Sequence, residues 1–294
     1  MIRRVIVIGS SGQLGQEFKN NIQFNKQFHT LYYTKNECDI TDYQETKKII
    51  QDSRPNVVIN CAAYTNVEKA ETEQDLANNI NNLAVENLAI LSNRYNFTLI
   101  HFSTDYVFNQ TIGRPFTESD TTNPINFYGL TKNNGEEKIV NISKKYFIFR
   151  ISWVYGMYGK NFPKTIIDLT KKKSKLDVVN DQIGVPTSSI FILNTIIKIL
   201  QEYRIHSSSY GIYNCTPIGA CSWHDIASII LEKYKDEKNC ICKNINPVSS
   251  DKYKTIAKRP KYSLLNSESL STTFDIDIKK WDFYFDEFLA DFHY

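Results

Sequence analysis

The sequence predicts an α/β fold, a Rossmann-type doubly wound parallel sheet followed by a smaller C-terminal substrate-binding lobe. Two observations carry this prediction. Short strand-like runs alternate with helical patterns over the first half of the chain, and a glycine-rich turn follows the first of those runs. The 294 residues leave room for one large domain and a second, smaller lobe.

Each predicted strand is short and rich in Val, Ile, Leu, Phe or Tyr, as strands of a parallel sheet covered on both faces are. We expect strands at 4–8, 30–33, 57–60, 99–103 and 147–150, with a sixth at 211–214 that returns to the main sheet. The expected division is a dinucleotide-binding domain of residues 1–150 with about 188–214, and a substrate-binding lobe of about 151–187 with 215–294.

Helical periodicity fills the gaps between these strands. Helices are predicted at 13–24, 43–53, 74–95 and 127–143, then at 161–173, 189–203, 222–235 and 281–292, while 247–265 is polar and typical of a loop. The third helix places Leu76, Ile80, Leu83, Ala84, Leu88 and Leu91 on one face. We interpret this stripe as core, with an extension into a subunit contact as the alternative.

Composition excludes several classes of protein. The formal net charge of +3 is too small to indicate nucleic acid as a partner, and no apolar run approaches the ~20 residues of a membrane-spanning helix or forms a signal peptide. Six cysteines are scattered, and Cys240 and Cys242 lack a second pair at zinc-site spacing. We therefore expect reduced thiols in a cytoplasmic protein, without a metal site.

A phosphate-binding turn is predicted at residues 9–15. Gly9, Gly12 and Gly15 lie between the first strand and the first helix with the spacing G-x-x-G-x-x-G. Glycine there permits a tight turn and close approach of the backbone to a pyrophosphate, which the helix N-terminus also attracts. Because the strand–turn–helix setting is the one such a motif requires, we expect a dinucleotide cofactor.

The end of the second predicted strand bears on which cofactor is bound. An acidic residue there would hold the ribose 2′-hydroxyl of NAD, but the strand ends in Thr34 and Lys35. Lys35 is either a ligand of the 2′-phosphate of NADPH or a solvated surface lysine, so the sequence favours NADPH slightly over NADH. Asp39 and Ile40 follow and are expected to border the adenine, and 60–65 should pass the middle of the cofactor.

The predicted reacting groups come from two segments. Thr104 and Asp105 end a strand at the carboxyl edge of the sheet, where open α/β folds bind ligands. Tyr128 and Lys132 are four residues apart at the start of a helix, so their side chains share one face. We expect the lysine charge, reinforced by the nicotinamide ring of the cofactor, to lower the tyrosine pKa. Tyr128 then protonates the alkoxide formed when a carbonyl accepts hydride, and Thr104 donates a hydrogen bond to the same oxygen.

In this order, these residues resemble the extended short-chain dehydrogenase/reductases and, among them, the dTDP-4-dehydrorhamnose reductase family. The motifs that carry the resemblance are the glycine turn, NCAAYTNVEKAE at 60–71, STDYVF at 103–108, NFYGLTK at 126–132, FRISWVY at 149–155, NDQIGVPT at 180–187, SWHDIA at 222–227, and Arg259-Pro260. They run over nearly the whole chain.

The resemblance implies an NAD(P)H-dependent oxidoreductase that reduces the 4-keto group of a nucleotide-linked deoxysugar in the last step of dTDP-L-rhamnose, and hence polysaccharide, biosynthesis. Catalysis is assigned to Thr104, Tyr128 and Lys132. Cofactor contacts are assigned to Gly9, Gly12, Gln13, Leu14, Gly15, Asp39, Ile40, Ala63, Tyr64, Thr65, Tyr128 and Lys132. Substrate contacts are assigned to Thr104, Asp105, Trp153 and Arg259.

Two departures from the family pattern bear on the ligands. Lys261-Tyr262-Ser263 follows Arg259-Pro260 where the family usually carries an asparagine–serine pair. Some members form a magnesium-linked dimer through glutamates, but here only Glu17 matches, because Ile190 stands at the second position. We therefore expect no metal, a solvated Glu17, and either a monomer or a homodimer.

Three alternatives stay open at this stage. The first is a 4-ketoreductase that acts on a UDP-linked deoxysugar, and the second is a 4-ketoreductase that forms a talose derivative. The third is a non-catalytic, NADP-binding regulatory subunit. The Tyr128 and Lys132 pair argues against the regulatory subunit. A dehydratase is disfavoured because Tyr106 stands where a second acid would be needed after Asp105.

Overall fold

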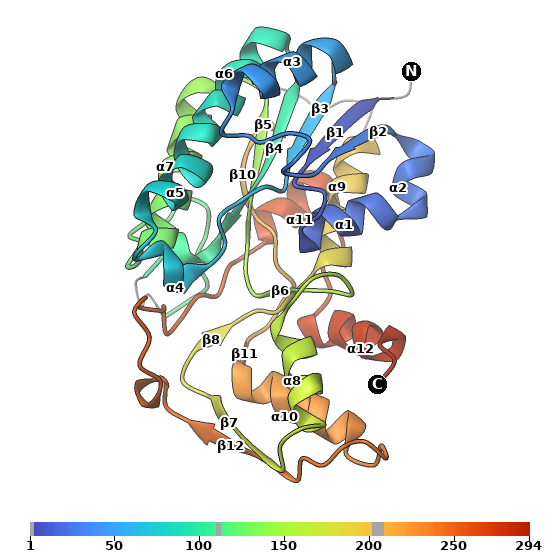
Figure 1. Ribbon diagram of the computed structural model, residues 1–294, viewed down its shortest axis with the longest axis vertical. Helices are drawn as coiled ribbons and strands as arrows, with labels where there is room; N and C mark the ends of the chain where they lie inside the picture. The colour runs from blue at the N-terminus through green and yellow to red at the C-terminus, as the bar shows by residue number, and fades with distance from the viewer. Residues whose placement is uncertain (1–2, 110–112, 202–208) are drawn as a thin grey trace.

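The computed structural model describes residues 3–109, 113–201 and 209–294. Figure 1 shows two parts, a helix-flanked sheet that contains the N-terminus and a smaller lobe below it that contains the C-terminus. Within the described ranges, no helix is both long and apolar enough to cross a membrane.

One six-stranded parallel sheet organises the larger part. Its strands are β1 (Arg4–Ile8), β2 (His29–Tyr33), β3 (Val57–Asn60), β4 (Thr98–Thr104), β5 (Tyr146–Ile151) and β10 (Gly211–Asn214). They lie in the order β10-β5-β4-β3-β1-β2, and every pair is parallel. The predicted fold class is confirmed. The strand order reverses beside β1, and ligands of open α/β sheets bind at such a switch point.

Helices cover both faces of the sheet (Figure 1). One face carries α1 (Gln13–Asn20), α2 (Ile22–Gln27), α9 (Ser189–Gln201) and α11 (Glu268–Phe274), and the other carries α3 (Tyr43–Ser53), α6 (Ala84–Tyr95) and α7 (Phe127–Ile142). Alternate strand residues enter the two cores: Val5 and Val7 point to the first, and Ile6 and Ile8 to the second.

Two predicted helices are interrupted. The single helix predicted over 13–24 is two helices, because the Asn21 side chain accepts from Phe24 N and starts α2 with a new cap. The helix predicted over 74–95 consists of α5 (Gln74–Asn78), a π-helical turn (Asn79–Leu83) and α6. The last two residues of the helix predicted at 189–203 lie outside the described ranges.

The π-helical turn changes which residues of the predicted apolar stripe are buried. Ala84, Leu88 and Leu91 pack in the core, as predicted. Leu76 and Leu83 are each 44% exposed, so the prediction that the whole stripe is core is wrong for these two residues. An i→i+5 turn rotates the helix face relative to the 3.6-residue period from which the stripe was read.

The lobe is built from short elements that meet across long sequence separations. Its strands are β6 (Val154–Tyr155), β7 (Lys175–Val179), β8 (Ile183–Gly184), β9 (Thr187–Ser188), β11 (Cys221–Ser222) and β12 (Asn244–Val248), and its helices are α8 (Phe162–Thr170), α10 (Trp223–Tyr234) and α12 (Trp281–Asp291). β7 and β12 pair in parallel, so the stretch predicted to be a loop from residue 247 begins inside a strand.

The expected domain boundaries remain a proposal, and α11 is the segment that fits them least. Leu270 and Phe274 of α11 pack with Phe147 and Tyr213 of the sheet, although residues 215–294 were expected to form the lobe. We propose that the dinucleotide-binding domain includes this helix.

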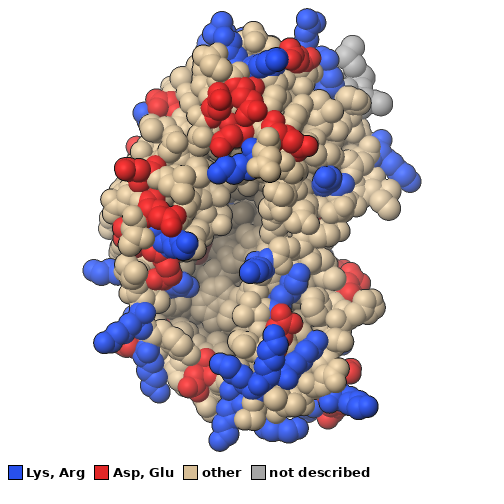
Figure 2. All heavy atoms as spheres, viewed as in Figure 1, with Lys and Arg blue, Asp and Glu red and all other residues tan. Residues whose placement is uncertain are grey.

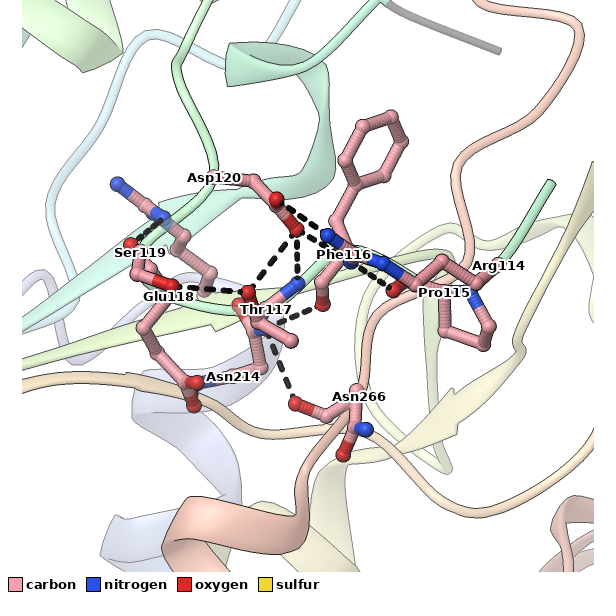
Figure 3. A network of polar contacts seen from close by, with 10 residues as sticks. Arg114, Pro115, Phe116, Thr117, Glu118, Ser119, Asp120, Asn214 and Asn266 are labelled. Carbon is pink, nitrogen blue, oxygen red and sulfur yellow. Dashed lines mark hydrogen bonds and ion pairs between the residues drawn. The ribbon is translucent and has the colours of Figure 1, made fainter. Parts of the chain in front are cut away.

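A loop between β4 and α7 is fastened to the last strand of the sheet (Figure 3). Asp120 accepts two hydrogen bonds from Arg114, each 2.7 Å long, and a third from Thr117 N. Asn214, at the end of β10, donates its side-chain amide to the carbonyl oxygens of Phe116 and Asn266. This network joins three segments that are far apart in the sequence.

Candidate active site

The glycine turn has the geometry of a phosphate cradle. Gly9 has φ of +81°, and a Cβ there would lie 2.6 Å from Ala62 N. A Cβ at Gly15 would lie 2.2 Å from the Gly9 carbonyl oxygen. Side chains are excluded at both positions, which brings β1, β3 and the start of α1 close together. Gly12 is the N-cap of α1 and has no side chain to cover the first helical turn.

Two cavities meet at this turn. The larger, of about 500 Å³, is lined by Gly12, Gln13, Leu14, Ala63, Thr65, Thr104, Asp105, Tyr128, Lys132, Trp153 and Arg259, among others. The smaller, of about 190 Å³, is lined by Gly9, Gly12, Lys35, Asp39, Ile40 and Ala63, among others. Gly12 and Ala63 border both cavities. The two cavities together therefore suit an elongated ligand whose middle lies on the glycine turn.

Two residues assigned to the cofactor do not line either cavity. Gly15 acts through packing beneath the turn. Tyr64 is held away from the cavities, since its hydroxyl donates to Glu73 and its backbone N–H and C=O both bond to the Asn81 side chain. Asn81 also donates to Thr131 of α7, so it connects the loop after β3 to the helix that carries Tyr128.

At the tip of β2, Lys35 extends over the smaller cavity. Its side chain is 71% exposed, and Nζ lies 4.0 Å from Asp39 Oδ2. The Tyr33 carbonyl oxygen accepts from Gly9 N and Ser10 N, so the backbone of β2 is fixed to the glycine turn. Thr34 contacts Glu37 through both its N–H and its hydroxyl. Lys35 is therefore the charged side chain of this strand end that borders the cavity.

The predicted reacting groups come together in the larger cavity. Tyr128 is half-buried, and loss of solvation raises the pKa of its phenol to about 12, with a Thr104 hydrogen bond opposing the rise and Asp105 adding to it. The expected lowering of this pKa by Lys132 together with the nicotinamide ring of a bound cofactor stays a prediction. The Lys132 ammonium is directed elsewhere, and loss of solvation dominates.

Lys132 points into the sheet. Its Nζ donates to the Phe102 carbonyl oxygen at 2.6 Å and lies 3.1 Å from His101 Nε2. The side chain is 1% exposed, and burial lowers the lysine pKa to about 8 although Glu136 opposes the change. An amine that holds its proton this weakly can exchange it near neutral pH.

Asp105 is a buried carboxyl group with an unused oxygen. Burial raises its pKa to about 7, while hydrogen bonds from Ser263 and Thr104 oppose the rise. Thr104 Oγ1 donates to Oδ1 at 3.0 Å, and Oδ2 has no partner among the described residues.

Trp153 lines the same cavity as the reacting groups. Its backbone φ is +45°, a left-handed conformation that is costly for a bulky residue. The indole stacks on Trp223 with centroids 3.6 Å apart and lies against Gly184, where a Cβ would come within 2.5 Å of the ring. The strained turn and the small neighbour thus hold a flat aromatic surface at the cavity.

A third cavity, of about 1070 Å³, continues from Trp223 into the lobe. Figure 2 shows the hollow between the two parts, with basic side chains gathered on the lobe side. Lys254, Lys258, Arg259 and Lys261 line it. Arg259 also borders the larger cofactor-side cavity, and its Nη2 bonds to Glu68 at 3.1 Å while its buried Nε has no partner within the described chain.

The prediction that Glu17 is solvated is wrong. Glu17 is 6% exposed between α1 and α9 and accepts from Ser189 Oγ. Burial raises its pKa, which the Ser189 hydrogen bond opposes. Ile190, at the other family position, is 37% exposed. No cluster of three or more potential metal ligands occurs within 3–109, 113–201 and 209–294.

Several residues of the site were not identified from the sequence. Trp223 lies in the motif SWHDIA but has no recognisable role until its ring is placed on Trp153. His101 and Asn60 read as ordinary strand residues, and Asn81 reads as a helix residue. Their positions depend on contacts between elements, and no local pattern signals those contacts.

Comparison with known proteins gives consistent matches. A family model described as RmlD substrate binding domain matches residues 3–294. A dTDP-4-dehydrorhamnose reductase of Aggregatibacter actinomycetemcomitans is 36% identical over 282 residues, 95% of each chain. A spore coat polysaccharide biosynthesis protein of Bacillus subtilis is 34% identical over 267 residues, 91% of this chain and 90% of that one.

Solved structures agree over nearly the full length. The dTDP-4-dehydrorhamnose reductase of Bacillus anthracis in complex with NADP has a TM-score of 0.92 and 35% identity, covering 99% of this chain and 100% of that one. The Clostridium acetobutylicum protein has a TM-score of 0.89 and 36% identity, covering 98% of each chain. A Thermus thermophilus UDP-glucose 4-epimerase, 14% identical with a TM-score of 0.78, covering 98% of this chain and 99% of that one, shares the fold.

Proposed function

This chain belongs to the dTDP-4-dehydrorhamnose reductase family, and from that premise we propose which of its residues carry the reaction. It is an NAD(P)H-dependent oxidoreductase that reduces the 4-keto group of dTDP-4-dehydro-β-L-rhamnose to dTDP-β-L-rhamnose. This reaction is the last step of dTDP-L-rhamnose synthesis.

We propose that the cofactor spans the two cavities that meet at the glycine turn. The excluded side chains at Gly9 and Gly15 and the uncovered N-terminus of α1 fit a pyrophosphate. Lys35, Asp39 and Ile40 would contact the adenosine half, while Tyr128 and Lys132 would contact the nicotinamide half. When bound, the reduced nicotinamide supplies the hydride to the carbonyl carbon.

The protein supplies the proton. As the carbonyl oxygen gains charge, Thr104 Oγ1 donates a hydrogen bond to it and Tyr128 transfers its phenolic proton to it. A phenol whose pKa is raised to about 12 stays fully protonated at neutral pH, which suits a proton donor. The resulting phenolate is neutralised by a proton from Lys132, whose amine holds that proton weakly.

We propose that the nucleotide sugar extends from the 500 Å³ cavity that holds the reacting groups into the third cavity, in the lobe. The sugar would lie against the Trp153 indole, within reach of Thr104 and Asp105, and the diphosphate would lie near Arg259. The unpaired Arg259 Nε supports this placement, because a guanidinium donates readily to phosphate. Lys254, Lys258 and Lys261 add positive charge along the same path.

The observation that most directly supports this function is that one cavity, which opens onto the glycine turn, is bordered by Thr104, Tyr128 and Lys132. The test is absorbance of reduced nicotinamide with dTDP-4-dehydrorhamnose as substrate, for the wild type and for Tyr128→Phe. We expect Tyr128→Phe to lower kcat by roughly 10²–10⁴-fold, a far larger effect than on the Kd for NADPH. The matched control is Tyr106→Phe, whose ring packs edge-on against Tyr128 at 5.8 Å and which should retain most activity.

Two outcomes would redirect the proposal. Turnover of a UDP-linked or talose-forming 4-keto sugar in preference to the dTDP substrate would reassign the sugar pocket and keep the chemistry. Tight NADPH binding without turnover of any 4-keto sugar would favour the regulatory-subunit alternative. The expected cytoplasmic location, the absence of a metal and the choice between monomer and homodimer stay predictions.

A further inference from the structure

A buried chain of polar groups leads from the loop after β3 to Lys132. Asn60 Oδ1 accepts from Ala62 N at 3.1 Å, Asn60 Nδ2 lies 3.2 Å from His101 Nδ1, and His101 Nε2 lies 3.1 Å from Lys132 Nζ. Asn60, His101 and Lys132 are each 1% exposed. Because water does not reach these groups, they must satisfy one another.

Which of these polar groups donates and which accepts follows from the Ala62 N–H at one end of the series. The Ala62 N–H can only donate, so Asn60 must present its oxygen there and its NH₂ group to His101. An NH₂ group can only donate, so His101 Nδ1 must be the unprotonated nitrogen. Burial and the Lys132 charge hold the His101 pKa well below its usual value, so the ring is neutral and carries its one proton on Nε2.

We propose that His101 is a positioning residue for catalysis: held by Asn60, it directs an N–H at the Lys132 amine and thereby loosens the hold of that amine on its proton. An imidazole N–H is matched to a neutral amine, which accepts it through the nitrogen lone pair. It is mismatched to an ammonium group, which presents a second donor to the same contact.

The consequence lies in restoring Tyr128 after each turnover. The tyrosine loses its phenolic proton to the product oxygen and must regain one. A lysine that is disfavoured as ammonium passes a proton to the phenolate, and its amine then accepts the waiting His101 N–H. A proton from solvent restores the ammonium before the next turnover. The Phe102 carbonyl oxygen keeps Nζ in place at 2.6 Å during this exchange. His101 therefore acts through Lys132 and contacts neither ligand.

Other charged groups lie around Lys132 and act on it in both directions. Glu136 on α7 favours the ammonium, but its carboxylate is already paired with Arg150 of β5 at 2.6 Å. The remaining titratable and charged groups that border the same cavity are Cys61, Asp105, Tyr106, Tyr128, Lys160 and Arg259. Each of them is unaltered in the variants below. A shift in the proton affinity of Lys132 therefore comes from the hydrogen bonds of Asn60 and His101.

The test compares the pH dependence of kcat/KM with NADPH in wild type, Asn60→Asp and His101→Phe. In Asn60→Asp, the carboxylate accepts from both Ala62 N and His101 Nδ1, so Nε2 becomes an acceptor for the ammonium. In His101→Phe, the opposing N–H is absent. We expect the basic limb of the profile to move to higher pH by about one unit in both, which is the size of one hydrogen bond between protein groups.

A second readout is independent of turnover. In protein labelled with [ε-¹³C]lysine and saturated with NADP⁺, the Lys132 signal, assigned by its loss in Lys132→Arg, should titrate at higher pH in both variants than in wild type. This inference rests on the proposed function, but the lysine titration still decides it if the chain turns over a different sugar or none.

The matched control is Ser143→Ala. Ser143 caps the C-terminus of α7, is 5% exposed and shares a 2.7 Å hydrogen bond with Ser92, so its loss also breaks a buried polar contact of this helix. It should lower stability and leave the Lys132 titration unchanged. Unshifted or lower titration of Lys132 in Asn60→Asp and His101→Phe overturns the proposal, as does an equal shift in Ser143→Ala.

Discussion

The rings of Trp153 and Trp223 lie 3.6 Å apart and within 12° of parallel, although the two residues belong to different segments of the lobe. Trp223 also packs against Phe162 at 4.6 Å and donates its indole N–H to Gln182. The stack forms a partition between the cavity that holds the reacting groups and the basic cavity of the lobe.

Replacement of Trp223 by Leu should therefore weaken binding of the nucleotide sugar. Loss of the stack frees Trp153, and an aromatic pair contributes about 0.5–1.5 kcal/mol, so KM for the sugar nucleotide should rise several-fold to roughly tenfold. The Kd for NADPH, measured by fluorescence titration, should stay unchanged. Phe162→Leu is the matched control, since it removes an aromatic neighbour of Trp223 without touching Trp153. Weaker NADPH binding in Trp223→Leu would contradict a role confined to the sugar side.

Lys35→Ala should change the cofactor preference. The side chain borders the small cavity, and its ion pair within the described part of the chain is a 4.0 Å contact with Asp39, which is weak enough to yield to a 2′-phosphate. We expect kcat/KM for NADPH to fall by about tenfold and that for NADH to stay nearly constant, from parallel assays with both cofactors. Lys26→Ala, an exposed lysine on α2, removes the same charge elsewhere. Equal losses with both cofactors would exclude a contact with the phosphate.

Asp105 should make stability depend on pH. Because burial raises its pKa to about 7, the folded chain keeps a proton between about pH 4 and 7 that the unfolded chain has lost. The free energy of unfolding contributed by this group is therefore greatest at low pH, and it falls by about 1.4 kcal/mol per pH unit as pH rises through that window. Urea unfolding of wild type and Asp105→Asn at several pH values measures the difference. Parallel stability curves would show that Asp105 titrates normally.

The ion pair of Glu136 and Arg150 should be costly to break and cheap to replace. Both side chains are 3% exposed, and Glu136→Gln leaves a buried guanidinium without its counter-charge. We expect Glu136→Gln to lower the free energy of unfolding by about 3–5 kcal/mol, whereas Glu136→Leu combined with Arg150→Met should recover much of the loss. Chemical denaturation measures both. Lys138→Ala breaks the more exposed pair with Glu86 and should cost less than about 1 kcal/mol.

The sequence predicted the central sheet well because each of its strands obeys a local rule. Residues 5–8 and 57–59 are apolar throughout, since helices cover both faces, and Gly9 marks the turn that follows the first strand. The helix break at Asn21 was missed because a single capping side chain decides it, within a pattern that otherwise reads as continuous.

The lobe and the second layer of the site escaped prediction for a different reason. Strands such as β8 and β11 have two residues each and exist only because Gly184 and Cys221 meet across a long sequence separation. The contact between His101 and Lys132 depends likewise on how α7 packs on β4. Motifs identified Thr104, Tyr128 and Lys132, but their environment, and so the pKa of Tyr128, depends on burial that spacing does not encode.

The position of β10 has a consequence for how the chain folds during its synthesis. β10 is the last strand to join the sheet, and the elements from β6 to α9 come before it in the chain. During synthesis from the N-terminus, β5 is therefore an open sheet edge until residues 211–214 leave the ribosome. Such an edge can recruit strands from other chains. A ribosome that pauses between β5 and β10 would thus leave a nascent chain that is prone to aggregate, and chaperones would have to protect it until the edge is closed.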